Sequence, residues 1–113
     1  MPPKQPLYPL VDVVTLAKAG KVTFHRNAQR DYMELGLSTQ QAKDVIAWLT
    51  IDEFRKTLSY DEPPPGVTYD DYLVPKRLPD GTTPSLYIKL RIPSPASVDY
   101  VYVTSFHKQR PIE

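Results

Sequence analysis

A strict alternation of apolar and polar residues between positions 85 and 92 constrains the fold of this chain more than any other feature. The apolar set is Leu86, Ile88, Leu90 and Ile92, and the polar set is Ser85, Tyr87, Lys89 and Arg91. Successive side chains of a β-strand point to opposite faces, so this period of two predicts a half-buried strand. One face of the strand would enter a core, and the other would present a phenol and two cations.

A second strand is expected over residues 97–108, where β-branched and aromatic residues predominate. The segment ends near His107, and histidine is the side chain that exchanges protons most readily near neutral pH. In an unbroken strand, His107 would share a face with Val101, Val103 and Ser105. If that valine face enters the core, His107 reaches the opposite face only through a β-bulge or a bend past the strand end.

The first half of the chain favours helices. Apolar spacing predicts helices over residues 10–19, 27–34, 39–48 and 51–58; Asn27 is expected to cap the second, and capping boxes begin the last two at Ser38 and Thr50. A short strand is expected over residues 21–25, an edge strand over 69–74 and an Asp-Gly turn at 80–81. Helices first and antiparallel strands last predict an α+β fold, with the helices on one face of the sheet.

Length and composition limit the classes of function. The chain of 113 residues suffices for one domain, and the absence of cysteine excludes disulfides and thiolate metal sites. The two histidines, His25 and His107, have no ligand spacing, so no metal and no cofactor are expected. No apolar run could span a bilayer and the N-terminus has no apolar signal region, so a cytoplasmic protein without membrane contact is expected. Residues 1–8 are predicted to be a mobile arm, 59–68 an exposed acidic loop and 109–113 a tail.

The last third of the chain is basic, although the whole chain has a formal charge of only +1. Residues 75–113 carry six Lys/Arg against three Asp/Glu, which favours contact with a phosphate. Tyr87, Lys89, Arg91 and His107 together offer proton-transfer groups and cations, the groups that a metal-independent ribonuclease needs. Tyr100 and Tyr102 could stack on bases, although such a pair is more often found in a core or a protein interface.

The order and spacing of several segments resemble the MqsR family of bacterial toxins. The segments that carry the resemblance are Leu16–Val22, Glu34–Leu37, Val45–Leu49, Glu53–Lys56, Tyr72 with Pro75, Leu86–Leu90 and Val103–His107. The resemblance implies a RelE-like fold, with the N-terminal helices packed on one face of a curved antiparallel sheet that the C-terminal half mainly forms. It further implies an endoribonuclease that cleaves mRNA without a metal and arrests translation and growth. It also implies a type II toxin–antitoxin pair, in which the antitoxin joins a zinc-binding domain to a helix-turn-helix domain. The ribosome is a further candidate partner.

The resemblance also assigns site residues. The helical lysine of the family corresponds to Lys56 and its strand tyrosine to Tyr87, whereas its C-terminal lysine corresponds to His107, with Lys108 next. The family glutamine corresponds to Tyr69 or Asp70, neither of which is glutamine. The expected catalytic residues are therefore Lys56, Tyr87 and His107. The expected substrate-binding residues are Tyr69, Asp70, Lys89, Arg91 and Lys108.

Two other functions stay open on the sequence. One is a non-catalytic module of the same fold that binds RNA or protein. The other is a toxin with a protein target, such as gyrase. A fold does not decide among these functions, because one fold can carry many kinds of site.

Overall fold

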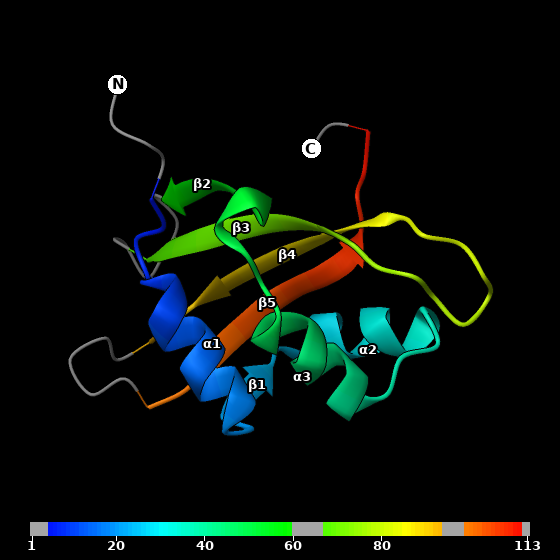
Figure 1. The fold of residues 1–113 in the computed structure, drawn as a ribbon, viewed down its shortest axis with the longest axis horizontal. Coiled ribbons are helices and arrows are strands. Elements are labelled where there is room, and N and C mark those ends of the chain that lie inside the picture. The colour runs from blue at the N-terminus through cyan, green and yellow to red at the C-terminus, as the bar shows by residue number, and fades with distance from the viewer. Residues whose placement is uncertain (1–4, 60–66, 94–98, 112–113) are drawn as a thin grey trace.

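The computed structural model describes residues 5–59, 67–93 and 99–111, which form an α+β arrangement as predicted. Three helices lie on one side of a five-stranded sheet in this part of the chain (Figure 1). The helices are α1 (Leu10–Lys18), α2 (Arg26–Glu34) and α3 (Thr39–Ala47), followed by the 3₁₀ turn η1 (Ile51–Glu53). The strands are β1 (Val22–Phe24), β2 (Phe54–Ser59), β3 (Thr68–Pro75), β4 (Ser85–Arg91) and β5 (Val101–Lys108).

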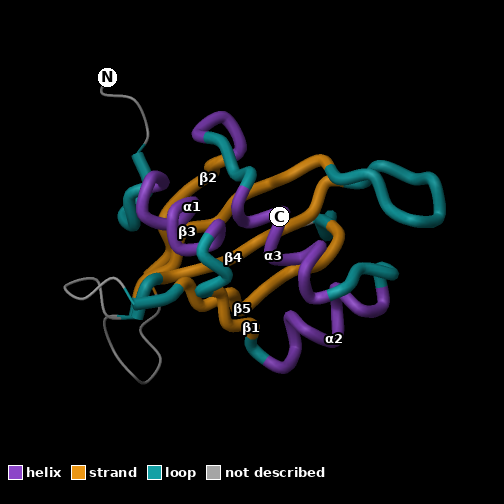
Figure 2. Tube along the Cα trace, turned by 60° about the horizontal axis from the view of Figure 1, so that its bottom comes forward, coloured by secondary structure: helices purple, strands orange, loops and turns teal. Residues whose placement is uncertain are grey.

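The strand order across the sheet is β1-β5-β4-β3-β2, with β1 and β2 at the two edges (Figure 2). Strand β1 runs parallel to β5, and the other neighbours are antiparallel. The sheet is therefore mixed, whereas a wholly antiparallel sheet was expected. Strand β3 lies between β4 and β2, so the prediction of an edge strand at residues 69–74 is wrong.

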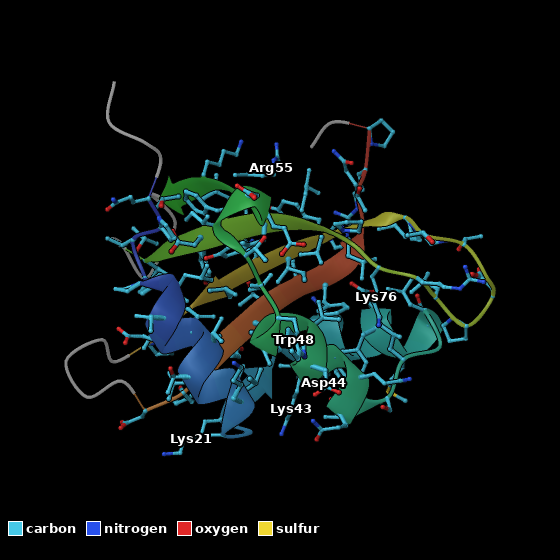
Figure 3. All side chains as sticks on the ribbon, viewed as in Figure 1. Lys21, Lys43, Asp44, Trp48, Arg55 and Lys76 are labelled. Carbon is cyan, nitrogen blue, oxygen red and sulfur yellow. The ribbon has the colours of Figure 1, made fainter. Side chains whose placement is uncertain are left out.

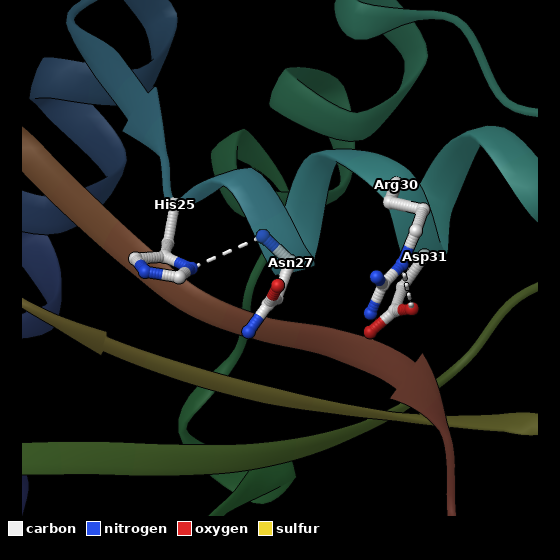
Figure 4. Close-up of polar contacts among 4 residues, drawn as sticks. All are labelled: His25, Asn27, Arg30 and Asp31. Carbon is white, nitrogen blue, oxygen red and sulfur yellow. Dashed lines mark hydrogen bonds and ion pairs between the residues drawn. The ribbon is translucent and has the colours of Figure 1, made fainter.

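The ends of the helices follow local chemistry. Helix α3 begins with the predicted capping box, in which Gln41 N–H donates to the Ser38 hydroxyl and Ser38 N–H donates to the Gln41 amide oxygen. The cap of helix α2 is His25 and not Asn27 as predicted, because the ring Nδ1 of His25 accepts the N–H of Asn27 at 3.1 Å (Figure 4). Gly36 follows α2 with a φ of +82°, a conformation that glycine adopts without steric cost.

The helix predicted over residues 51–58 is wrong. Only Ile51–Glu53 form a helical turn, and the chain then continues as β2. The capping residues still act locally, since Thr50 N–H donates to the Glu53 carboxylate at 2.8 Å. Beyond that turn the edge of β3 supplies the partner for backbone hydrogen bonds, and the Phe54 ring packs edge-on against Tyr72 at 5.5 Å. A capping box marks where a helix begins and does not fix its length.

The arm predicted to be mobile over residues 1–8 is docked at its described end. The backbone N–H groups of Leu7 and Tyr8 donate to the Asp70 carboxylate at 3.1 and 2.7 Å. Tyr8 is buried, and its hydroxyl donates to the Thr68 carbonyl at 3.0 Å. The polar bonds and the buried ring together hold this segment against β3.

The core lies between the helices and one face of the sheet. Strand β4 and Ile92 directly after it contribute the apolar set predicted from the alternation, and β5 contributes Val101, Val103 and Phe106, each completely buried. The Asp-Gly turn of the β3–β4 connection is present, with Gly81 at φ +88° and Leu78 buried. In the described residues, no helix is long and apolar enough to cross a membrane. Most of the predicted acidic loop, residues 60–66, lies outside the described residues, as do residues 94–98.

Candidate functional site

Strand β5 contains a β-bulge that decides where His107 lies. Along its ladder with β4, Lys89 is opposite Ser105 and Leu90 is opposite Val103, so Thr104 is an extra residue. Val103 and Phe106, three positions apart, are therefore both completely buried in the core, which an unbroken period of two forbids. His107 consequently lies on the face opposite to Val101 and Val103. The bulge is one of the two routes that the sequence left open for this residue.

We call the face of the sheet opposite the three helices the outer face. Its side chains come from the strand positions that alternate with the core positions, and the ladder arranges them in three rows. The histidine row is Leu73, Tyr87 and His107; the lysine row is Asp71, Lys89 and Ser105; and the tyrosine row is Tyr69, Arg91 and Tyr102. Five residues predicted for the site thus come together on one surface: Tyr69, Tyr87, Lys89, Arg91 and His107.

The histidine row holds a stacked pair of rings. The ring centroids of Tyr87 and His107 are 5.3 Å apart and the planes differ by 26°. Tyr87 is only 8% exposed, yet it is not part of the helix-covered core. His107 Nδ1 donates to the Lys108 carbonyl at 2.7 Å, because a carbonyl oxygen can only accept. The neutral imidazole therefore carries its lone pair on Nε2, the form that accepts a proton.

A second bulge, in β2, brings Lys56 to the outer face. Lys56 is opposite Asp71 and Thr57 is opposite Asp70, and the register shift makes Arg55 the extra residue. Thr57 donates to Asp70 on the helix side, so the exposed Lys56 points to the outer side. Lys56 was expected on a helix, and it reaches the candidate site from an edge strand instead.

Asp71, opposite Lys56 on β3, is a completely buried carboxylate. It accepts the Lys56 backbone N–H at 3.0 Å, and its second oxygen is 3.7 Å from the Arg55 guanidinium. Figure 3 labels Arg55 on β2, which is an edge strand of the sheet. Sequence reasoning missed both Arg55 and Asp71 as site residues, since their meeting depends on the β2–β3 register, which no local pattern specifies.

The tyrosine row is held by contacts between cations and rings. The Arg91 guanidinium carbon lies 5.8 Å from the Tyr69 ring centroid and 5.9 Å from that of Tyr102. Lys89 Nζ is 5.0 Å from the Tyr69 centroid. The sequence had grouped Tyr102 with Tyr100, and its contact with Arg91 follows from the β4–β5 ladder, where the two residues are opposite each other.

Two predicted site residues do not reach the outer face. Asp70 is completely buried on the helix side, where Leu7, Tyr8 and Thr57 donate to it, so the structure gives it an anchoring contact. Lys108 is opposite Leu86, a core residue, and therefore also points to the helix side. Its ammonium lowers the pKa of the Asp80 carboxyl to a smaller extent than do the hydrogen bonds from Thr82.

Other polar groups of the described chain form no comparable cluster. His25 caps α2, and the Arg30–Asp31 ion pair of that helix spans 3.9 Å at the surface (Figure 4). Within residues 5–59, 67–93 and 99–111, no group of three His, Asp or Glu side chains is arranged to hold a metal ion. The three rows of the outer face are therefore the candidate functional site.

The sequence matches no protein-family model, and no curated protein is detectably similar to it. The resemblance to the MqsR family and the RelE-like fold therefore stay predictions. The chemistry open to this chain has to be inferred from the geometry of the outer face.

Proposed function

We propose that this protein is an endoribonuclease that cleaves mRNA without a metal ion. The observation that carries the proposal is the bulge in β5, which stacks His107 against Tyr87 beside a row of cations. A proton acceptor, a phenol and several cations on one surface are the groups that phosphodiester cleavage by an internal nucleophile requires.

In the proposed reaction, His107 Nε2 accepts the proton of a ribose 2′-hydroxyl, and the 2′-oxygen attacks the neighbouring phosphorus. The bond from phosphorus to the 5′-oxygen breaks, and the leaving oxygen takes a proton from the Tyr87 phenol. The products are a 2′,3′-cyclic phosphate and a 5′-hydroxyl. A later proton transfer from the imidazolium to the phenolate, directly or through solvent, restores both groups.

The cations stabilise the charge that develops on phosphorus. Lys89 and Arg91 stand beside the reacting row on β4, and Lys56 approaches from β2. The buried Asp71 carboxylate holds the Arg55 guanidinium and the Lys56 backbone, so this part of β2 is positioned before the substrate arrives. Preorganised charges of this kind contribute more to the transition state than to the ground state.

The biological setting follows from the resemblance to MqsR. We propose a toxin of a type II toxin–antitoxin system that acts in the cytoplasm and arrests translation and growth by cutting mRNA. Its partner would be an antitoxin with a zinc-binding and a helix-turn-helix domain. The ribosome would be a further partner if cutting occurs during translation.

The test is cleavage of a defined RNA in the presence of EDTA, with the new ends analysed. Wild-type protein is expected to produce discrete cuts with cyclic-phosphate ends. The His107→Ala variant is expected to cut about 10²- to 10⁴-fold more slowly, because it lacks the proton acceptor. Lys108→Ala is the matched control: it changes the adjacent residue, whose side chain points to the helix side, and should cut within a few-fold of wild type. Circular dichroism checks that both variants are folded.

Three results would contradict the proposal or a part of it. RNA binding without cuts would favour the non-catalytic module. Growth arrest on expression, with neither RNA binding nor cuts, would favour a toxin with a protein target such as gyrase. Full cleavage by folded His107→Ala protein would remove His107 from the mechanism.

A further inference from the structure

We propose that the tyrosine row, Tyr69, Arg91 and Tyr102, is a subsite that stacks unpaired nucleobases of single-stranded RNA. This inference rests on the proposed function, because it assumes that the outer face binds RNA. It adds a second contact region, separate from the reacting groups of the histidine row, and a restriction on the substrate: the RNA must be unpaired where it crosses β4.

The chemistry of the row suits a base. Bases stack on tyrosine rings and on arginine guanidinium planes, and such stacking accepts any base because every base has a π-face. Arg91 lies within 6 Å of both ring centroids, so the three side chains form one layer across β3, β4 and β5. All three are partly exposed, which leaves each of them surface that a base can cover.

The row is also preorganised. The Arg91 Nε is buried and the guanidinium lies within 6 Å of both ring centroids, so its contacts with the two rings restrict the side chain. A side chain that is already ordered loses little conformational freedom when a ligand binds.

The spacing of the rows matches the parts of a single strand of RNA. Arg91, Lys89 and Tyr87 follow one another at every second position of β4, so the tyrosine row lies about 13 Å from the histidine row along the strand. Lys89 stands between the two, where it can contact a phosphate. A strand of RNA along β4 would then place a base on the tyrosine row, a phosphate at Lys89 and a 2′-hydroxyl at His107. A duplex cannot use this surface in the same way, because its bases are already paired and stacked.

A purely structural role is the competing explanation. Cross-strand contacts between cations and rings stabilise sheets without any ligand. The two roles differ in one measurable property: a base-stacking subsite distinguishes an oligonucleotide with bases from one without them, and a structural ladder does not.

The experiment measures binding of a fluorescent single-stranded 2′-O-methyl oligouridine by anisotropy, since the blocked 2′-oxygen prevents cleavage. An abasic oligomer of the same length is the second probe. The Tyr102→Ala and Tyr69→Ala variants are each expected to bind the uridine probe about 5- to 150-fold more weakly than wild type. Tyr102→Phe keeps the ring and should bind like wild type. Wild type and Tyr102→Ala should bind the abasic probe equally.

Trp48→Ala is the matched control variant. Trp48 is 76% exposed on the helix side of the molecule, where Figure 3 labels it directly after α3, and its removal should leave binding of both probes unchanged. Thermal melts of every variant establish that the sheet is intact.

The proposal is overturned if Tyr102→Ala binds the uridine probe as tightly as wild type, or loses affinity equally for the abasic probe. A parallel cleavage assay separates this outcome from the proposed function. Cleavage that persists with no base-dependent binding leaves the nuclease standing and removes the subsite. Base-dependent binding by a wild-type protein that cuts no RNA keeps the subsite and removes the nuclease.

Discussion

The two faces of the sheet are built from the same strands, yet they differ in how they accommodate the extra residue of a β-bulge. The helix-covered face is mostly apolar, and its residues Ile88, Leu90, Val103 and Phe106 are completely buried. The outer face carries the cations, the stacked rings and the extra residues of two bulges. The comparison shows that packing in the core fixes which strand residues face the helices on both sides of each bulge. The remaining side chains then point to the outer face.

Strand β5 shows how strong this constraint is. Without the extra residue, Phe106 would turn to the outer face and His107 would enter the apolar core. Burial of an imidazole ring without a hydrogen-bond partner destabilises the folded state, whereas burial of a phenylalanine ring stabilises it. The bulge lets Phe106 enter the core while His107 stays on the outer face, and the candidate site is a consequence of that arrangement.

The largest expected effect on stability is at the core side of the bulge. Phe106→Ala should lower the free energy of unfolding by about 3–5 kcal/mol, because it removes a completely buried ring that contacts Phe24 and Tyr32. Ser105→Ala, its neighbour on the outer face, should change the free energy by less than about 0.5 kcal/mol. Urea denaturation measures both, and similar losses in the two variants would contradict the division into two faces.

A smaller effect on stability is expected at Asp70 and Asp71, the adjacent carboxylates of β3 that point to opposite faces. Asp70→Ala leaves the Leu7 and Tyr8 N–H groups without their acceptor, which should cost about 1–3 kcal/mol and release the arm. Limited proteolysis should then cut near Leu7 sooner than in wild type. Asp71→Ala changes the outer face, and the arm should stay protected. Equal protection of the arm in wild type and Asp70→Ala would show that its anchor lies elsewhere.

The smallest effect concerns Tyr72, on the helix side. Burial, and to a smaller extent the Asp70 carboxylate, raise the pKa of the Tyr72 phenol above its ordinary value near 10. Below about pH 10 the phenol is protonated in both folded and unfolded chains. At higher pH the unfolded chain loses this proton first, so stability falls as pH rises.

Tyr72→Phe should therefore lose less stability than wild type between pH 8 and about pH 11. At neutral pH it should be neutral or stabilising by up to about 1 kcal/mol, because the buried hydroxyl has no hydrogen-bond partner among the described residues. Denaturation curves at the two pH values give the comparison. Parallel losses in both proteins would place the alkaline sensitivity on other groups.

Much of the fold could be predicted because it is encoded locally. The alternation of residues 85–92 identified the buried face of β4, and the Ser38 capping box identified the start of α3. Residues 51–58 were mistaken for a helix because the apolar spacing of Ile51, Phe54 and Leu58 suits a helix, whereas the edge of β3 decides the outcome. The docking of the arm on Asp70 joins residues more than 60 positions apart, which no local pattern reveals.

The alternation of residues predicted only the β4 part of the candidate site, and Lys56 and Tyr69 were assigned through the family resemblance. Tyr87, Lys89 and Arg91 follow directly from the alternation, and His107 required a bulge whose position the sequence does not fix. One signal was present: three apolar residues, Val101, Val103 and Phe106, cannot share a face unless the strand is interrupted between the last two. Lys108 and Asp70 were placed at the site by resemblance alone, and the ladder puts both on the helix side.

The most direct test of this account uses the absence of cysteine from the chain, which makes single-cysteine variants unambiguous. In the folded state, the His107→Cys variant should react much faster with a thiol reagent than the Val103→Cys variant, and both should react equally in denaturant. An unbroken strand would put these two positions on the same face. Equal protection or equal reactivity of the two folded variants would contradict the bulge and, with it, the proposed place of His107 beside Tyr87.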